Sequence, residues 1–140
     1  MSDKVTGGCQ CGAVRYECSE GPIMAGHCQC TNCQKFTGTG HATNMAFSKE
    51  AFTVSGEVSS YEYTADSGNT MHRYFCPKCG SPVYGDSSGN PAALMVRVGS
   101  LDDPSIFEAN FIVYTSSAQD WDHLDASIPS FPAMPPKPGS

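Results

Sequence analysis

Eight cysteines at short spacings constrain this 140-residue chain more than any other feature. They form a Cys-x-Cys at 9–11, a Cys-x-Cys-x-x-Cys at 28–33 and a Cys-x-x-Cys at 76–79, with Cys18 standing alone. Cysteines one residue apart are poorly placed for a mutual disulfide and well placed to share a metal ion. Because the N-terminal residues lack an apolar signal segment, we expect a cytoplasmic protein with metal-bound cysteines. Export by a route without a visible signal would leave disulfides as the alternative.

The most specific local pattern is "FCPKCGSP", residues 75–82. In a Cys-x-x-Cys-Gly knuckle both thiolates hold one metal, and backbone N–H groups after Cys76 can donate to its sulfur. Gly80 can adopt the positive φ that closes the turn. A redox Cys-x-x-Cys pair is the alternative, but that motif usually opens a helix, whereas "GSPVY" is typical of a turn and a strand. The pattern therefore predicts a metal knuckle.

A knuckle supplies two ligands, so a closed site needs two more. Cys9 and Cys11 lie in "GGCQCGAV", where flanking glycines permit close approach. With Cys76 and Cys79 they would complete a closed, all-thiolate zinc site. Such a site is structural and contributes directly to the free energy of folding.

The segment "HCQCTNC", residues 27–33, brings Cys28, Cys30 and Cys33 into about one turn of chain. Cys18 alternates in phase with two apolar residues of its own segment, so it fits a small buried core residue, with a fourth ligand as the alternative. If Cys18 is a core residue, three thiols form a site with an open fourth position. An open position is typical of a catalytic zinc.

The charge of such a site favours sulfur ligands. Zn²⁺ with three thiolates has a net charge of about −1, which makes it a weaker Lewis acid than a site with neutral ligands. A thiol substrate therefore fits better than activation of water. The following segment, "QKFTGTGHATN", offers groups that could bind substrate or, in the case of His41, transfer a proton. The substrate-binding candidates are Lys35, Phe36, Gly38, Gly40 and Asn44.

Each of these candidates also has an ordinary structural explanation. Lys35 fits a solvated surface lysine, Phe36 a core residue and the two glycines a turn. His27, His41 and His72 fit hydrogen-bonded structural histidines better than metal ligands. We expect His123 at the surface and Trp121, the only tryptophan, as an anchor of the core.

Composition indicates a globular chain, and the pattern of short segments indicates a mainly β fold. Eight basic residues against 14 acidic ones give a net charge of −6, which argues against nucleic acid as a partner. No apolar run reaches the length of a membrane span.

Alternating and β-branched segments predict short strands, with helix confined to short turns after Cys30 and around 118–124. We expect one domain over residues 5–131 and a proline-rich tail over 132–140. The predicted strands cover 13–18, 41–47, 51–56, 59–64, 71–75, 81–85, 93–99 and 110–115.

The cysteine series and its flanking residues resemble the glutathione-dependent formaldehyde-activating enzyme family, which shares its domain with centromere protein V. The matching segments run in family order over nearly the whole chain. They are "GGCQCGAVRY", "CQCTNCQKFTGTGHATN", "YTADSGNTMHRYFCPKCGSPVY", "VRVGSLDDP" and "SAQDWDHLD…IPSF".

The resemblance implies a β-tent fold of small antiparallel sheets with short helical turns, stapled by two zinc ions per chain. It assigns Cys9, Cys11, Cys76 and Cys79 to a structural zinc, and Cys28, Cys30 and Cys33 to a catalytic one. Cys18 lies outside the family's metal pattern, and Asn110 stands where many relatives carry histidine.

The activity implied by the resemblance is that of a carbon–sulfur lyase, which interconverts S-(hydroxymethyl)glutathione or a related thiol adduct with glutathione and formaldehyde. Three alternatives keep parts of the site. They are a non-catalytic glutathione- and zinc-binding carrier, a zinc hydrolase of a small imine-type substrate, and a zinc-stabilised interaction module.

Overall fold

The computed structural model describes residues 4–135, which form ten β-strands, one α-helix and four short 3-10 helices. The predicted mainly β fold with short helical turns is confirmed. No helix within this described range is long and apolar enough to cross a membrane. The chain divides into two compact units: the first comprises residues 1–23 and 45–107, and the second comprises 24–44 and 108–140.

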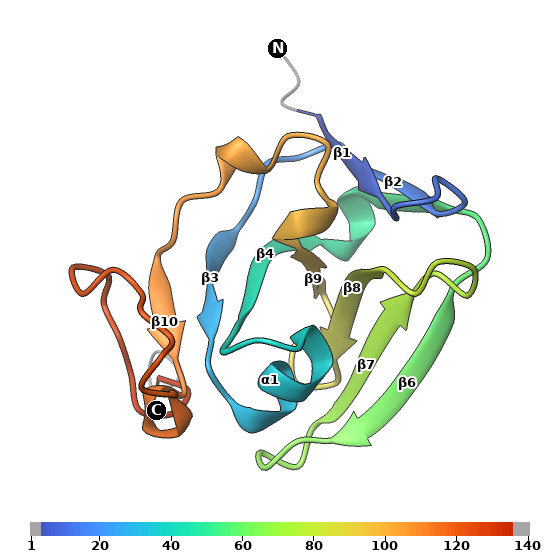
Figure 1. The fold of residues 1–140 in the computed structure, drawn as a ribbon. Helices are drawn as coiled ribbons and strands as arrows, with labels where there is room; N and C mark the ends of the chain where they lie inside the picture. The colour runs from blue at the N-terminus through green and yellow to red at the C-terminus, as the bar shows by residue number, and fades with distance from the viewer. Residues whose placement is uncertain (1–3, 136–140) are drawn as a thin grey trace. The chain divides into compact units, whose positions relative to one another are not determined.

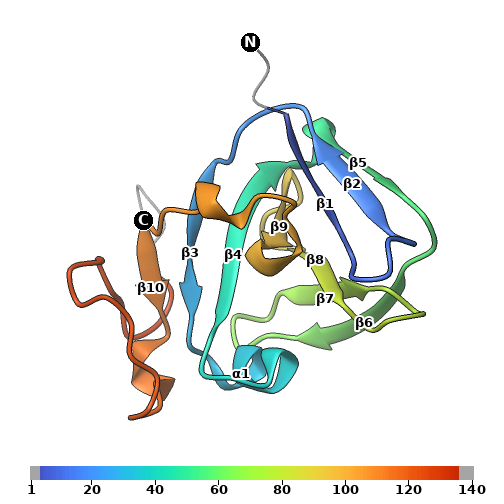
Figure 2. The ribbon, with the colours of Figure 1, turned by 45° about the horizontal axis from the view of Figure 1, so that its top comes forward.

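The first unit contains a small antiparallel sheet and a run of antiparallel strands. The small sheet has the order β1-β2-β5, and its three strands lie side by side in Figure 2. The other four strands are consecutive in the chain and pair in the order β9-β8-β7-β6 (Figure 1). The strands of the first unit are β1 (Val5–Gly8), β2 (Arg15–Cys18), β5 (Phe52–Ser55), β6 (Ser59–Thr64), β7 (Thr70–Phe75), β8 (Pro82–Ser87) and β9 (Ala93–Arg97). Its 3-10 helices are η1 (Lys49–Ala51), η2 (Val98–Ser100) and η3 (Pro104–Ile106).

The core of the first unit follows the alternation seen in the sequence. Val14, Tyr16 and Cys18 are buried, with 0%, 3% and 0% of their surface exposed, because alternate residues of a strand point to the same face. The Tyr16 ring stacks on Phe52 with centroids 5.5 Å apart, and Phe52 packs against Tyr84 at 4.9 Å. Burial raises the pKa of the Cys18 thiol to about 11, as expected of an apolar core position.

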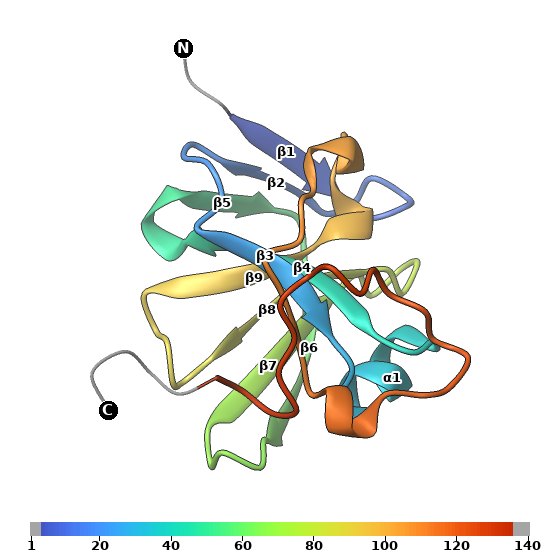
Figure 3. The same ribbon diagram turned by 90° about the vertical axis from the view of Figure 1, so that its left-hand side faces the viewer.

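The second unit contains the strand and the helix that carry the motif "HCQCTNC". Strand β3 (Met24–Cys28) leads into helix α1 (Thr31–Thr37), and β4 (Ala42–Ser48) begins in this unit and continues into the first. Strand β10 (Phe111–Val113) pairs with β3 in parallel. The 3-10 helix η4 (Thr115–Ser117) lies beside α1 (Figure 3), where Gln34 Nε2 donates to the carbonyl of Ser117 at 2.9 Å.

Two strands were not predicted, and both contain glycine where a neighbour comes close. In β3, a Cβ on Gly26 would lie 2.5 Å from the ring of Phe111. In β1, a Cβ on Gly7 would lie 2.3 Å from the hydroxyl of Tyr16. Glycine weakens the sequence signal of a strand while permitting this approach. The parallel pairing of β10 with β3 also departs from the expected antiparallel sheets.

The predicted helix at 118–124 is wrong. This segment is irregular, with one turn in which the N–H of Asp122 donates to the carbonyl of Gln119 at 3.0 Å. Trp121 was expected to anchor the core, but 61% of its surface is exposed. Asp122 points inward instead, and this orientation explains why the aromatic residue beside it faces outward.

The predicted tail over 132–140 is described only up to residue 135, so its residues 136–140 lie outside the described range. At its start, the carbonyl of Pro132 accepts a hydrogen bond from Ser116 Oγ at 2.7 Å.

Candidate functional site

Four cysteines of the first unit bring their sulfur atoms together from two distant parts of the chain. All four ligand atoms lie within 4.8 Å of one another, and the Cys11 sulfur lies 3.7 Å from those of Cys9 and Cys76. A tetrahedral zinc ion with Zn–S bonds of about 2.3 Å separates its sulfurs by about 3.8 Å. The arrangement therefore fits a metal held by four thiolates. The cluster consists of Cys9, Cys11, Cys76 and Cys79.

The backbone around these cysteines is arranged to favour thiolates. The N–H groups of Lys78 and Cys79 donate to the Cys76 sulfur at 3.3 and 3.5 Å, as the knuckle pattern predicts. Gly80 has φ 77°, a left-handed conformation that glycine adopts without strain. The hydroxyl of Ser81 lies 3.2 Å from the Cys79 sulfur, and its hydrogen bonding lowers the pKa of Cys79 to about 5.

Three cysteines of the second unit form a separate cluster at the junction of β3 and α1. Cys28 ends the strand, Cys30 is the N-cap of the helix, and Cys33 lies in its first turn. Their sulfurs lie within 4.8 Å of one another, and all three side chains are half-buried. Among residues 4–135, no fourth cysteine, histidine, aspartate or glutamate joins this group. Because Cys18 belongs to the core of the first unit, its interpretation as a fourth ligand loses support.

The helix cap explains how the three sulfurs converge. The N–H of Cys33 donates to the Cys30 sulfur at 3.3 Å, which satisfies one of the donors at the start of the helix. Gly38 closes the same helix with φ 77°, and its N–H donates to the carbonyl of Gln34. The cap therefore holds the Cys30 sulfur beside Cys33 at the start of α1.

A bound cation would relieve the repulsion between thiolates in this cluster. Hydrogen bonds from Cys28 and Cys33 lower the pKa of Cys30 to about 2, whereas the pKa of Cys28 rises to about 11 and that of Cys33 also rises. One thiolate is thus favoured, and the second and third are opposed by the first. A divalent cation would remove this repulsion, since metal ions stabilise the deprotonated form of their thiol ligands.

A network of polar side chains adjoins the three-cysteine cluster. Gln29, between two of the cysteines, is 4% exposed, and its Nε2 donates to Asp122 Oδ2 at 3.0 Å. His41 Nδ1 lies 2.9 and 3.0 Å from the two carboxylate oxygens of Asp122. The His41 ring packs edge-on against His27 with centroids 4.9 Å apart. Sequence reasoning missed Gln29 and Asp122, because a polar residue inside a cysteine motif and an acidic residue in a supposed helix carry no distinctive pattern.

The other sequence candidates lie in different surroundings. Lys35 is exposed on α1, whereas Phe36 on the same helix and Asn44 on β4 are half-buried. Gly40 is buried, and the space left by its missing side chain is occupied by Asp122. We therefore assign Gly40 a packing function.

The remaining histidines and Asn110 have structural partners or lie at the surface. His27 Nδ1 lies 2.9 Å from the hydroxyl of Thr43, and burial lowers its pKa, with His41 adding to the effect. His72 bridges two carboxylates in the first unit, and His123 is exposed. The Oδ1 of Asn110 accepts a hydrogen bond from the N–H of Ala25 at 2.9 Å, so this residue fastens the segment before β10 to β3.

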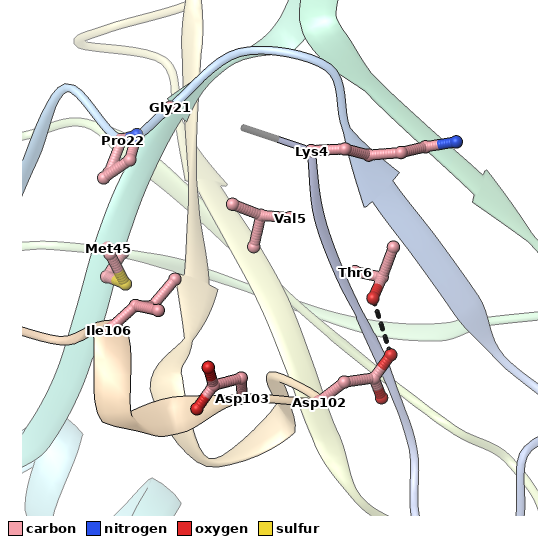
Figure 4. A pocket seen from close by; sticks show the side chains of 9 residues that line it. All are labelled: Lys4, Val5, Thr6, Gly21, Pro22, Met45, Asp102, Asp103 and Ile106. Atoms are coloured by element: carbon pink, nitrogen blue, oxygen red, sulfur yellow. Dashed lines mark hydrogen bonds between the residues drawn. The ribbon is translucent and has the colours of Figure 1, made fainter. Parts of the chain in front are cut away.

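The first unit also contains a cavity of about 460 Å³ (Figure 4). Thr6, Met45 and Asp102 are among its lining residues, and none of the cysteines or predicted substrate-binding residues lines it. The Asp102 carboxylate already accepts hydrogen bonds from Thr6 and Arg15. The lining of this cavity therefore includes none of the candidate site residues.

Fold and clusters together define a mainly β protein with two clusters of cysteine thiols that could hold metal ions. The sequence matches the profile of the family described as glutathione-dependent formaldehyde-activating enzyme over residues 4–117. Because this match covers most of the chain, the protein belongs to that family.

One curated relative carries the name of the same family, and one solved structure shares the fold. A Halomonas elongata protein, whose name places it provisionally among the glutathione-dependent formaldehyde-activating enzymes, is 34% identical over 83 residues. The match covers 56% of this chain and 53% of the relative, so it spans about half the length of that protein. The crystal structure of a Rhodobacter sphaeroides protein shares the fold, with a TM-score of 0.57 and 23% identity over 74% of this chain and 96% of that one.

Proposed function

We propose that the protein is a zinc-dependent carbon–sulfur lyase that interconverts S-(hydroxymethyl)glutathione, or a related thiol adduct, with glutathione and formaldehyde. The observation that carries this proposal is the cluster of Cys28, Cys30 and Cys33, which offers three ligands and no fourth among the described residues. Family membership supports the same class of reaction. A cytoplasmic location is part of the proposal, supported by eight free thiols.

In this proposal the two clusters have different functions. The four thiols of the first unit would hold a structural zinc, and the three thiols of the second unit would hold a catalytic zinc. When bound at the second cluster, zinc would stabilise the sulfur of the substrate as a thiolate. The sulfur-rich ligand set favours a sulfur substrate over water, which makes the imine hydrolase the weaker alternative.

The reaction requires one bond cleavage and one proton transfer. In the lyase direction the C–S bond breaks, its electron pair stays on sulfur, and the hydroxyl oxygen of the adduct loses its proton as the carbonyl of formaldehyde forms. His41 is our candidate for accepting that proton at Nε2, because Nδ1 is engaged by Asp122. In the opposite direction the same nitrogen returns the proton to the oxygen.

Substrate binding is proposed for the residues beside the cluster. Lys35 is exposed on α1 and could offset the negative carboxylates of glutathione, while Phe36 and Asn44 could contact its apolar and polar groups. Gly38 ends the helix, and a Cβ at this position would meet no atom within 4 Å, so a substrate could approach the backbone there. These assignments are expectations for a bound substrate.

The test compares the enzymatic rate with the spontaneous reaction, because adduct formation also proceeds in buffer. We expect exchange at saturating glutathione and formaldehyde to exceed the buffer rate, and we expect Cys30→Ser to abolish the excess while the protein stays folded. Cys18→Ala is the matched control, since Cys18 is a buried cysteine outside both clusters. A wild-type rate equal to that of buffer, with glutathione still bound, would favour the carrier. Unfolding of Cys30→Ser would show that the second cluster is structural.

A further inference from the structure

Asp122 contacts two segments of the second unit, one on each side of helix α1. Its carboxylate accepts a hydrogen bond from Gln29 Nε2 at 3.0 Å and lies 2.9 and 3.0 Å from His41 Nδ1. Only 7% of the Asp122 side chain is exposed. Gln29 stands between Cys28 and Cys30, so one carboxylate fastens both the cysteine loop and the candidate proton acceptor.

The fit around Asp122 is close. A Cβ added to Gly40 would lie 2.3 Å from Asp122 Cγ, a distance that real Cβ contacts essentially never show. The absence of a side chain at position 40 therefore permits the carboxylate to reach its two partners. On the other side, Gln34 Nε2 donates to the carbonyl of Gln29 at 2.9 Å, which holds the Gln29 backbone in place.

The hydrogen-bonding chemistry of the carboxylate fixes the state of the imidazole. An ionised carboxylate only accepts hydrogen bonds, and a neutral imidazole carries its hydrogen on one nitrogen alone. Burial raises the pKa of Asp122, but the hydrogen bonds from Gln29 and His41 outweigh it, so this pKa lies below its ordinary value and the side chain is ionised near neutral pH. Nδ1 of His41 must then carry the hydrogen, and Nε2 remains free to accept a proton.

We infer that Asp122 is a positioning residue that holds His41 in the Nδ1–H tautomer and fixes its ring relative to the loop carrying Cys28 and Cys30. Through this contact Asp122 acts on the reaction without touching the substrate. The effect on catalysis depends on the proposed lyase function, whereas the effect on the His41 tautomer does not. Loss of an orienting carboxylate removes both the correct tautomer and the stabilisation of the imidazolium that forms during proton transfer.

The conservative variant is Asp122→Asn, which keeps the size of the side chain. Both carboxylate oxygens lie within 3.0 Å of His41 Nδ1, so in either orientation the amide of asparagine places its NH₂ group within hydrogen-bond distance of that nitrogen. This NH₂ group only donates, so it favours an Nδ1 without a hydrogen. We expect kcat to fall on the order of 10²-fold, as for the loss of a positioned acid–base group, with KM changed by less than about threefold. In the lyase direction, where His41 accepts the proton, the acidic limb of the kcat pH profile should shift at the same time. Asp120→Asn, at an exposed aspartate two residues away, is the matched control and should retain wild-type kcat.

The second measurement is the tautomer of His41, observed through its ring nitrogens by NMR in protein labelled with ¹⁵N-histidine. The chain has four histidines, and His41→Gln identifies the relevant signal. At a pH well above the ordinary histidine pKa of about 6.5, we expect Nδ1–H in the wild-type protein and a loss of that preference in Asp122→Asn.

These outcomes separate the two proposals. The Nε2–H form of His41 in the wild-type protein would overturn the inference. This measurement needs no variant, so the inference can still be tested if Asp122→Asn does not fold. Wild-type kcat and pH profile in a folded Asp122→Asn would also overturn it, while leaving the lyase function intact. If the wild-type protein shows no rate above buffer, the lyase function fails and the tautomer measurement still tests the positioning contact.

Discussion

Replacing Cys76 by serine should show how far the four-cysteine cluster stabilises the fold. Cys76 has no exposed surface, its sulfur accepts two backbone N–H groups, and it lies 3.7 Å from the Cys11 sulfur. A serine hydroxyl is a poor zinc ligand, since structural zinc sites use thiolate and imidazole groups. The variant therefore loses one of four ligands and leaves the remaining three as a weaker site.

The size of this effect follows from the free energy of metal binding. Structural zinc binding contributes about 10–16 kcal/mol to the folding of small zinc domains, which is comparable to the whole stability of a typical protein. Removing one of four ligands should then cost about one quarter of this, or about 2.5–4 kcal/mol. At roughly 3–4 °C per kcal/mol for a chain of this length, we expect Tm to fall by about 8–16 °C.

The assay is thermal unfolding followed by circular dichroism, together with metal analysis of the purified protein. Cys18→Ala is the matched control because Cys18 is equally buried and lies outside the cluster. Losing its sulfur should cost about 1 kcal/mol through lost packing and leave the metal content unchanged. A Cys76→Ser protein with full metal content and the same Tm as Cys18→Ala would refute the structural assignment of the cluster.

Two further predictions concern pH. The Arg15 guanidinium, 2.9 Å from Asp102, lowers the pKa of that carboxyl to about 2 from its ordinary 3.8, so the pair stabilises the fold above pH 3.8 and loses this contribution as pH falls toward 2. Asp102→Asn should abolish that acid dependence, and because both groups are nearly half exposed the loss at neutral pH should stay below about 1 kcal/mol in urea unfolding. Hydrogen bonds that the His72 ring donates to Asp86 and Glu62 raise the pKa of His72, so its contribution is complete below the ordinary histidine pKa and disappears as pH rises through the elevated value. His72→Gln should flatten the pH dependence of Tm near neutrality, and an unchanged profile would show that these contacts do not act on stability.

The strands with strong side-chain alternation could be predicted from the sequence. In β2, buried and exposed residues alternate in the expected phase, because one face of the strand packs against aromatic rings. The knuckle at Cys76 was also predictable, since Gly80 and the N–H groups after Cys76 are parts of one local turn. Local patterns were sufficient wherever the determining contacts lie within a few residues of each other.

The features that were missed depend on contacts between distant parts of the chain. The sequence signal of strand β3 is weak because it contains Gly26. A glycine is needed there because the ring of Phe111, about 85 residues later in the sequence, occupies the space of a side chain. The sequence around Trp121 predicts a helix. It does not show that Asp122 bonds to Gln29 and His41, two contacts that hold this segment in an irregular conformation. Such a pairing can be found only from the folded chain.

The most direct test of the account is metal analysis combined with a glutathione titration of the Co²⁺-substituted protein. We predict two metal ions per chain, with the absorption of one of them changed by glutathione and lost in Cys30→Ser, while the other is unaffected by either. A single ion per chain, or two ions whose spectra both ignore glutathione, would contradict the presence of an open thiolate site at Cys28, Cys30 and Cys33.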